Sequence, residues 1–150
     1  MREKKMKVLV QRVKQASVAV EGKEISKIEK GFLVFVGITH TDTEKEADYL
    51  IKKVTNLRVF EDENGKMNLS IKDVKGKLLI VSQFTLYGNC ENGNRPSFTE
   101  AAKPDIANPL YEYFCSKCEQ EGIEVQKGIF GADMKVSLIN DGPVTIILEK

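Results

Sequence analysis

The sequence contains no tryptophan and only one histidine, His40, and this scarcity limits the catalytic chemistry that the chain can support. A serine or threonine nucleophile normally needs an adjacent base, so a Ser-His-Asp triad would have to use His40. That residue lies in a threonine-rich connection before a predicted helix, where a lone histidine is usually solvated. The Gly-x-Ser-x-Gly pattern of a nucleophile elbow is also absent around Ser82. We therefore expect an enzyme built on this chain to rely on positioning and backbone dipoles.

Cysteine and long apolar runs are scarce as well. Three cysteines, an odd number, in a chain without an export signal favour reduced thiols over a disulfide framework. No apolar run approaches the roughly 20 residues that cross a bilayer. The charged stretch Met1 to Lys7 is followed by an apolar segment that Gln11 and Arg12 interrupt, so no signal-peptide core is predicted. We expect a cytoplasmic protein without a membrane segment.

An excess of positive charge is also missing. Lys and Arg number 23 against 22 Asp and Glu, which gives a net charge of +1. Proteins that bind long stretches of nucleic acid usually carry a clearly basic surface. If RNA is a substrate, its binding should involve few phosphates, for instance only those of the single-stranded acceptor end, and DNA is not expected as a partner.

The patterns that are present indicate one folded domain over residues 1–150. A chain of this length buries roughly two thirds of its unfolded surface without metals or disulfides. No repeat, low-complexity tract or Pro/Ser-rich linker divides it. The apolar patterns follow the order strands, helix, strands, helix, strands. This order predicts an α/β fold, a single compact domain with two main helices and a layered or barrel-like β-sheet.

Capping signals predict the two helices. Thr43 and Glu46 form a capping box before a segment whose apolar positions repeat at helical spacing. Asn108 as N-cap and Pro109 as the first helical residue open the second helix, and Gly122 is its expected stop. Strands are predicted from β-branched and alternating apolar patterns. They cover residues 7–13, 17–21, 32–38, 58–60, 66–69, 77–84, 123–126, 134–139 and 144–148.

The segment Ser82 to Gly88 places two hydroxyls and an amide where an apolar strand ends in a turn. Sites tend to be built at strand ends, because the scaffold is rigid there while the groups stay accessible. The alternative is a strand that leaves the core with its polar side chains solvated or capping the turn. Short polar motifs are weak signals, so on chemistry alone this plainer interpretation is favoured.

Cys115 and Cys118 have the CxxC spacing of redox and zinc sites. They lie within the predicted second helix, however, and redox pairs sit at a helix N-terminus, where the helix dipole lowers a thiol pKa. A zinc site would need four ligands, and only Cys90 and His40 remain, in distant loops. A structural role is therefore favoured for this pair.

The run Asn140 to Pro143 is interpreted first as a turn between two strands. The functional alternative needs the Gly142-Pro143 bond to be cis, as about 5 to 6% of X-Pro bonds in folded proteins are. A cis bond can aim two neighbouring backbone carbonyls in the same direction. Such carbonyls would form a rigid pair of acceptors.

Five stretches are distinctive as a set, namely Gln11 to Val13, Ser82 to Gly88, Arg95 to Phe98, Phe130 to Met134 and Asn140 to Thr145. With them the chain resembles the D-aminoacyl-tRNA deacylase family of the bacterial and eukaryotic type. The similarity runs in order from Met6 to the C-terminus and leaves Met1 to Lys5 as an N-terminal extension. Cys90 occupies a loop position that varies in the family.

The resemblance implies a homodimeric hydrolase that cleaves the ester between a D-amino acid and tRNA. The bond that corresponds to Gly142-Pro143 is cis in the family and enters the active site of the partner subunit, where two carbonyls face the α-carbon of the substrate. An L-side chain would be driven into these carbonyls, whereas a D-side chain points to solvent and glycine has none. The resemblance therefore also implies removal of glycine mischarged onto alanine tRNA.

The same resemblance assigns roles to individual residues. Backbone N–H groups of Ser82, Gln83, Phe84 and Thr85 would stabilise the developing oxyanion. Thr85 lacks an adjacent base, so assistance by the ribose 2′-hydroxyl of the substrate is preferred over attack by its own hydroxyl. Arg12 would brace the Gly-Pro loop from the neighbouring chain. The residues expected to bind and select the substrate are Gly142, Pro143, Asn140, Thr145, Arg12, Phe130 and Met134, and neither a metal nor a cofactor is required.

Two other classes of protein stay open. The first is a non-catalytic nucleic-acid-binding protein on the same scaffold, which the near-neutral charge disfavours. The second is a thiol redox or zinc module built on Cys115 and Cys118.

Overall fold

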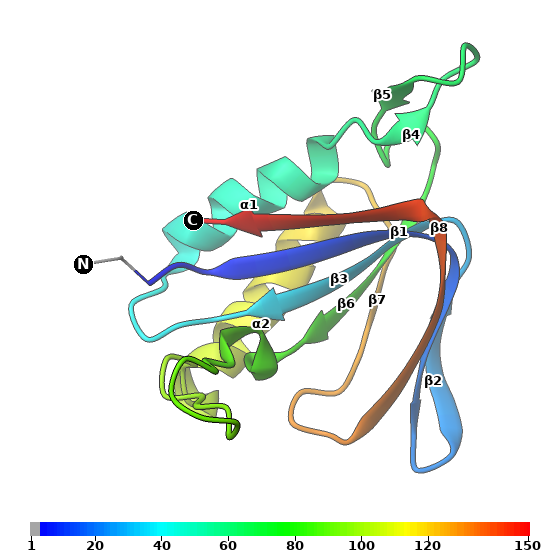
Figure 1. Cartoon of the computed structure of the whole chain (residues 1–150). Helices are drawn as coiled ribbons and strands as arrows, with labels where there is room; N and C mark the ends of the chain where they lie inside the picture. The colour runs from blue at the N-terminus through cyan, green and yellow to red at the C-terminus, as the bar shows by residue number, and fades with distance from the viewer. Residues whose placement is uncertain (1–3) are drawn as a thin grey trace.

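Residues 4–150 of the computed structural model form a mixed six-stranded sheet that curls toward a barrel, with two helices on one face (Figure 1). Met1, Arg2 and Glu3, part of the predicted extension, lie outside the described residues. The strands are β1 (Lys7–Val20), β2 (Lys23–Ile28), β3 (Gly31–Gly37), β4 (Phe60–Glu61), β5 (Met67–Leu69), β6 (Lys77–Ser82), β7 (Val125–Lys127) and β8 (Met134–Glu149). The helices are α1 (Glu44–Asn56), the short 3-10 helix η1 (Phe84–Tyr87) and α2 (Pro104–Gln120). The predicted α/β class is confirmed.

The long strand β1 organises the sheet. On one side it pairs with β3 through residues 7–13 and with β2 through residues 16–20, and on the other side β8 runs antiparallel along its whole length. β6 continues the sheet parallel to β3, and β7 lies parallel to β6. The Ser26 hydroxyl of β2 donates a hydrogen bond to the Lys127 carbonyl of β7, so the sheet curls until its far strands meet.

This curled sheet buries both faces of β3. Phe32, Val34 and Val36 join the core between the sheet and the helices. Leu33 and Phe35, which alternate with them, join a second core inside the curl. A strand covered on both faces needs apolar residues at every position, which accounts for its nearly continuous apolar sequence.

Helix α1 begins as its capping signals predict. The Thr43 hydroxyl accepts from the Lys45 N–H, and the Glu46 carboxylate accepts from the Thr43 N–H at 2.7 Å. The buried residues Leu50 and Val54 then face the core at helical spacing. The predicted capping box is confirmed.

Helix α2 starts earlier than predicted. Its N-cap is Lys103 and its first residue is Pro104, so the prediction that Asn108 and Pro109 open the helix is wrong. Either proline suits a first helical position, and Asn108 is by itself the better cap. The helix extends nonetheless, because the extra turn buries Ala107 on the face that packs against the core. The expected stop is confirmed, since Gly122 has φ +85° immediately after the C-cap.

Strand boundaries differ from the predictions at two places. The predicted strands at 7–13 and 17–21 are one strand, β1, and those at 134–139 and 144–148 are one strand, β8. The interpretation of Asn140 to Pro143 as a turn between two strands is therefore wrong, because the run is an irregularity within β8 where the register with β1 shifts. Strand β2 was not predicted.

Among residues 4–150, no helix is long and apolar enough to cross a membrane.

The turn between β3 and α1 contains a buried acid, Asp42. Burial raises its pKa to about 6, partly opposed by the 2.7 Å hydrogen bond from the Thr39 N–H and reinforced by the negative charge of Glu46. The folded protein therefore binds a proton more tightly than the unfolded chain. The contribution of protonated Asp42 to the free energy of unfolding is fully present below pH 4 and is lost as the pH rises toward 6.

We expect Asp42→Asn to remove this pH dependence while keeping an acceptor for the Thr39 N–H. Relative to wild type, the variant should gain about 2 to 3 kcal/mol in free energy of unfolding between pH 4 and pH 7. Urea titrations at several pH values measure the gain. Asp133→Asn, at an exposed acid on the surface, is the matched control and should show little change. A constant difference across this pH range would contradict the assignment.

Candidate active site

The segment Ser82 to Thr85 lies where β6 leaves the sheet. The Gln83 N–H donates to the Val36 carbonyl at 2.9 Å and is the last sheet bond of this edge. The Leu86 N–H then donates to the Gln83 carbonyl at 3.3 Å and starts the 3-10 turn. The N–H groups of Phe84 and Thr85 come before this first turn bond and have no acceptor among residues 4–150. Two adjacent backbone donors are thus available to an incoming group.

The hydroxyl of Thr85 has no base beside it. It accepts a hydrogen bond from the Gln83 side-chain amide at 2.8 Å and is exposed. His40 is also exposed, as predicted, and its Nε2 bonds to the Thr99 carbonyl at 2.7 Å instead of to a hydroxyl of the turn. Within residues 4–150 the geometry therefore contains no serine or threonine triad.

A second group of predicted residues surrounds the Gly142-Pro143 bond, which is cis. Gly142 has φ +148° and, with Pro143, is exposed. The Asn140 side chain closes the base of this loop, because it accepts from the Val144 N–H at 2.7 Å and donates to the Thr145 hydroxyl at 3.1 Å. The loop is therefore held by side chains on both of its flanks.

Arg12 fixes the same loop from β1. Its guanidinium is buried, with the residue 6% exposed, and it donates to the Asp141 carbonyl at 2.8 Å and to the Val59 carbonyl at 2.6 Å. No carboxylate pairs with it among the described residues. Arg12 thus braces the loop of its own chain, and the predicted contact to the loop of a neighbouring chain stays a prediction.

Val59 is a contact that sequence reasoning missed. Only its backbone carbonyl takes part, so no residue type in the sequence could have signalled it. It connects the Gly-Pro loop to the base of the β4–β5 hairpin, which projects from one end of the molecule in Figure 1.

Phe130 and Met134 lie near the segment Ser82 to Thr85, here called the β6 turn, and not near the Gly-Pro loop of the same chain. The Phe130 ring packs 6.2 Å from that of Tyr111, whose hydroxyl donates to the Ile80 carbonyl of β6 at 2.6 Å. Met134 packs against the core that contains Val81. Within one chain they border the end of β6.

The two halves of the predicted site do not meet within one chain. The Gly142 loop lies beside Val13 of β1, which pairs with Gly31 at the start of β3. Ser82 pairs with Val36 near the opposite end of β3 and lies on the far side of that strand. Three strand spacings, from β8 to β6, and five residue rises along β3 place the two groups on the order of 20 Å apart. A site that contains both needs a second chain.

The CxxC pair lies in the interior of α2. Cys115 and Cys118 are buried, and burial raises the pKa of each thiol to about 12. Thiols that stay protonated at neutral pH are poor nucleophiles and poor metal ligands. The geometry therefore supports the structural role predicted for this pair.

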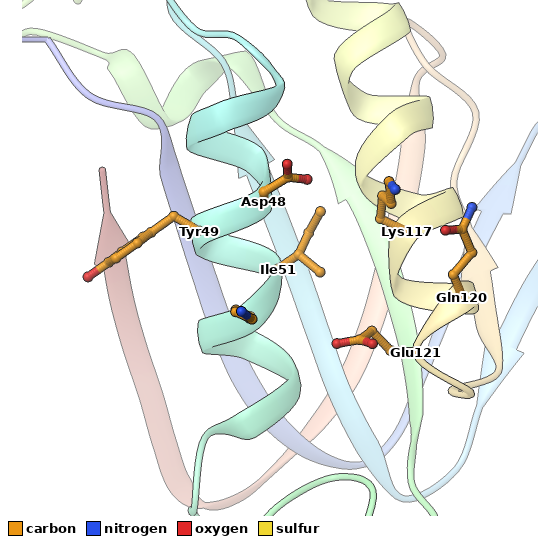
Figure 2. A pocket seen from close by; sticks show the side chains of 7 residues that line it. Asp48, Tyr49, Ile51, Lys117, Gln120 and Glu121 are labelled. Atoms are coloured by element: carbon orange, nitrogen blue, oxygen red, sulfur yellow. The ribbon is translucent and has the colours of Figure 1, made fainter.

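An open hollow of about 560 Å³ lies between the two helices and is separate from both groups (Figure 2). Its wall mixes charges, with Asp48 on α1 across from Lys117 on α2 in Figure 2, and with Lys52 and Glu121 also in its lining. These side chains do not converge on a common point in Figure 2. The hollow is not where the chemistry predicted from the sequence would take place.

The fold and the β6 turn define a class of protein before any comparison. The class is a small α/β domain in which a strand end presents two free backbone N–H donors and, among residues 4–150, no adjacent general base. The chain belongs to the D-Tyr-tRNA(Tyr) deacylase family, whose family model matches residues 9–149.

Relatives at high identity cover nearly the whole chain. A D-aminoacyl-tRNA deacylase of Exiguobacterium sibiricum is 59% identical over 97% of this chain and 100% of its own length. Those of Geotalea daltonii and Fusobacterium nucleatum are each 60% identical over 96% of this chain and 96% and 95% of their own lengths.

Solved structures share the fold. One, named c-Myc DNA Unwinding Element Binding Protein, has a TM-score of 0.90 and 43% identity over 96% of this chain and 98% of its own. Another, described as "a probable eukaryotic D-amino acid tRNA deacylase", has a TM-score of 0.84 over 98% of this chain and 100% of its own. Its identity of 17% supports the likeness in fold alone.

Proposed function

We propose that this chain hydrolyses the ester bond of D-aminoacyl-tRNA and releases the free amino acid and tRNA. The observation that carries this function is the match of 59 to 60% identity, over almost the full chain, to curated D-aminoacyl-tRNA deacylases. The activity places the enzyme in translation quality control. Because its substrate is tRNA, we place it in the cytoplasm.

The chemistry needs no reactive side chain. An aminoacyl ester is already activated, so orientation and stabilisation of the oxyanion suffice to accelerate its hydrolysis. The free N–H groups of Phe84 and Thr85 would bind the oxyanion, and one well-placed donor of this kind contributes roughly 3 to 4 kcal/mol. The ribose 2′-hydroxyl of the substrate would assist the attacking water. The N–H of Gln83, also predicted to bind the oxyanion, already donates to the Val36 carbonyl at 2.9 Å, so Ser82 and Gln83 would act by holding the turn that presents these donors.

Chiral selection would come from the Gly142-Pro143 loop of a second chain. Backbone carbonyls of this loop would face the α-carbon, so that an L-side chain meets oxygen atoms while a D-side chain points to solvent. Glycine has no side chain to exclude, and we propose that glycyl-tRNA mischarged on alanine tRNA is cleaved too. Asn140, Thr145 and Arg12 would keep the loop rigid. Phe130 and Met134 would line the pocket on the β6 side.

Exposed apolar side chains support the homodimer that this site requires. Along β8, Leu138 is 37% exposed, Ile139 48% and Ile147 63%. This strand is also an edge, since it pairs only with β1 among the described residues. Apolar side chains along an unpaired edge favour burial against another chain. Equilibrium sedimentation tests the proposal, and a monomer at micromolar concentration would contradict it.

The function is tested with D-tyrosyl-tRNA and L-tyrosyl-tRNA as separate substrates. Release of free tyrosine should be rapid from the D-ester and at the uncatalysed rate from the L-ester. Glycyl-tRNA is the third substrate and should be cleaved. Equal cleavage of both enantiomers, or of neither, would exclude the proposed function.

The role of Thr85 is tested by Thr85→Val, which keeps the shape of the side chain and removes its hydroxyl. We expect kcat/KM to fall by no more than about tenfold, because only the hydrogen bond from the Gln83 amide is lost. A substrate whose terminal ribose lacks the 2′-hydroxyl should react at least about 100-fold more slowly. Thr85→Ser is the control. A loss of several thousandfold for the valine variant alone would make Thr85 the nucleophile.

One observation favours a second candidate function. The solved structure at 43% identity is named for binding a DNA unwinding element, which would make this chain a non-catalytic nucleic-acid-binding protein. Its net charge of +1 disfavours extensive phosphate contacts. Tight, salt-sensitive binding to duplex DNA without deacylation would favour this second function over the first.

A further inference from the structure

The last residue of η1, Tyr87, is a buried tyrosine that the proposed chemistry does not use. It is 2% exposed, whereas Phe84 and Thr85 of the same helix are exposed. Its hydroxyl donates to the Lys5 carbonyl at 2.6 Å and lies 3.0 Å from the Gly37 carbonyl, which shares the same proton. Burial raises the pKa of Tyr87 above its usual value, so the hydroxyl remains a donor at neutral and mildly basic pH.

Helix η1 is attached to β3 at both of its ends. At the first end the N–H of its N-cap, Gln83, donates to the Val36 carbonyl at 2.9 Å. At the last end Tyr87 donates to the carbonyl of Gly37, the next residue of β3. The two free backbone donors of the segment lie between these attachments. The second attachment is made by a side chain, so it depends on the residue type at position 87.

The ring of Tyr87 packs directly against the ends of β3 and β1. A Cβ added at Gly37 would lie 3.0 Å from Cε2 of this ring and 3.2 Å from Cβ of Leu86. The Lys7 ammonium lies 5.1 Å from the ring centroid and donates to the Leu86 carbonyl at 3.4 Å. Lys7 itself pairs with Gly37 between β1 and β3. The end of η1 is therefore held by the same strand ends that support its start.

We propose that Tyr87 is a positioning residue for the hydrolysis, an inference that rests on the proposed function. Its hydroxyl keeps the last residue of η1 at the end of β3, and thereby keeps the two free N–H donors where the developing oxyanion needs them. A 3-10 helix of one turn has poor hydrogen-bond geometry and does not hold its own orientation. Such donors stabilise an oxyanion only when they are oriented before the reaction. Tyr87 thus acts through the backbone of Phe84 and Thr85 and does not itself contact the ester.

The first test is Tyr87→Phe, which removes the hydroxyl and keeps the ring. We expect kcat for D-tyrosyl-tRNA to fall about 10- to 100-fold, because displacement of a positioned group by about 1 Å costs up to that much. KM should change by less than about twofold, since no group that binds the tRNA is removed. The matched control is Tyr113→Phe, which removes a hydroxyl that donates to Asp48 between α2 and α1 at 2.6 Å, and it should keep kcat. Both variants are assayed where urea titration shows them to be folded.

Gly37→Ala tests the same contact from the side of β3. The added carbon displaces the ring of Tyr87 while the hydroxyl stays in the molecule. We expect kcat to fall at least about tenfold with KM retained. Wild-type kcat in a folded Gly37→Ala would contradict the positioning role.

A further measurement does not depend on turnover. A D-tyrosine phosphonate linked to adenosine carries a tetrahedral anionic centre in place of the ester carbonyl, whereas the corresponding amide keeps a planar, uncharged carbonyl. In calorimetry, Tyr87→Phe should weaken binding of the phosphonate by about the same factor as it lowers kcat/KM. Binding of the amide should weaken by less than about threefold. Equal weakening of both compounds would show that Tyr87 supports binding in general and would overturn the positioning role.

The outcomes separate this inference from the function on which it rests. If wild type hydrolyses D-tyrosyl-tRNA and a folded Tyr87→Phe keeps the wild-type kcat, the positioning role is excluded and the hydrolase stands. A fall of the same size in Tyr113→Phe, or a fall that sedimentation traces to a change in oligomeric state, also excludes it. If wild type hydrolyses neither D-tyrosyl-tRNA nor glycyl-tRNA, the proposed function is excluded, and the role of Tyr87 with it.

Discussion

Gly142→Ala is expected to lower kcat/KM for D-aminoacyl-tRNA by at least about 100-fold, as displacement of a positioning group commonly does, while the domain stays folded. An added Cβ would lie 2.8 Å from Cγ2 of Val144 and 3.0 Å from its backbone nitrogen, and 3.2 Å from Nη2 of Arg12. The residue also has φ +148°, a conformation that side chains rarely adopt. The loop must therefore move, and with it the carbonyls that would face the substrate.

Discrimination between enantiomers is the more informative readout of this variant. Relaxation of the loop should raise the ratio of L- to D-cleavage even where total activity is low. Unfolding in urea should show a loss of about 1 to 3 kcal/mol, the usual range for one strained residue. The matched control is Gly22→Ala in the β1–β2 turn, where φ is +78° but no atom lies within 4 Å of the added carbon. The control should lose comparable stability and no selectivity.

Full D-selective activity in Gly142→Ala would show that this loop is not the selector. An equal loss in Gly22→Ala would point to general destabilisation instead. If Gly142→Ala keeps its D-selectivity, selection between enantiomers must come from another part of the site.

The contrast between α1 and β8 shows what local sequence can and cannot predict in this chain. The start of α1 depends on Thr43 and Glu46, which lie within one turn of each other, and its prediction was correct. Asn140 to Pro143 contain every signal of a turn, yet they continue β8. The difference arises because β8 pairs with β1, more than a hundred residues away in the sequence. The residues on both sides of the run pair with β1 and keep the chain direction, while residues 141–144, which have no partner in β1, bulge out of the pairing.

The candidate site shows the same division. The stretch Ser82 to Thr85 could be located at a strand end from its pattern, and the resemblance named its role. The distance between this turn and the Gly142 loop could not be predicted, because it depends on strand order and on register. For Phe84 the resemblance predicted a role of the backbone N–H, and only the fold showed that its side chain is exposed.

Arg12→Ala should have the second large effect, because two carbonyl groups, that of Val59 buried and that of Asp141 half-buried, lose their donor together. The guanidinium now satisfies the Asp141 and Val59 carbonyls at 2.8 and 2.6 Å. An unsatisfied buried acceptor costs about 1 to 3 kcal/mol. We therefore expect the free energy of unfolding to fall by about 2 to 4 kcal/mol. The Asp141 carbonyl adjoins Gly142, so activity should fall on the order of 100-fold as the loop becomes mobile.

Arg12→Lys distinguishes support of the loop from a requirement for positive charge. Lysine keeps the charge, but its ammonium group is a single point and cannot reproduce the fixed fork that spans two carbonyls. We therefore expect activity between those of wild type and Arg12→Ala, with a higher ratio of L- to D-cleavage than wild type. Arg58→Ala is the matched control, because Arg58 is exposed and its hydrogen bonds within residues 4–150 go to Asn68 alone.

Kinetics of the three variants on both enantiomers, at a temperature where urea titration shows each to be folded, provide the measurement. A buried arginine that only stabilised the fold would lower activity in proportion to the folded fraction and leave the ratio of L- to D-cleavage unchanged. An arginine that holds the selecting loop must change that ratio in a fully folded enzyme. If Arg12→Lys matches wild type in both rate and ratio, the two-carbonyl contact does not position the loop, and rigidity must come from the Asn140 side alone.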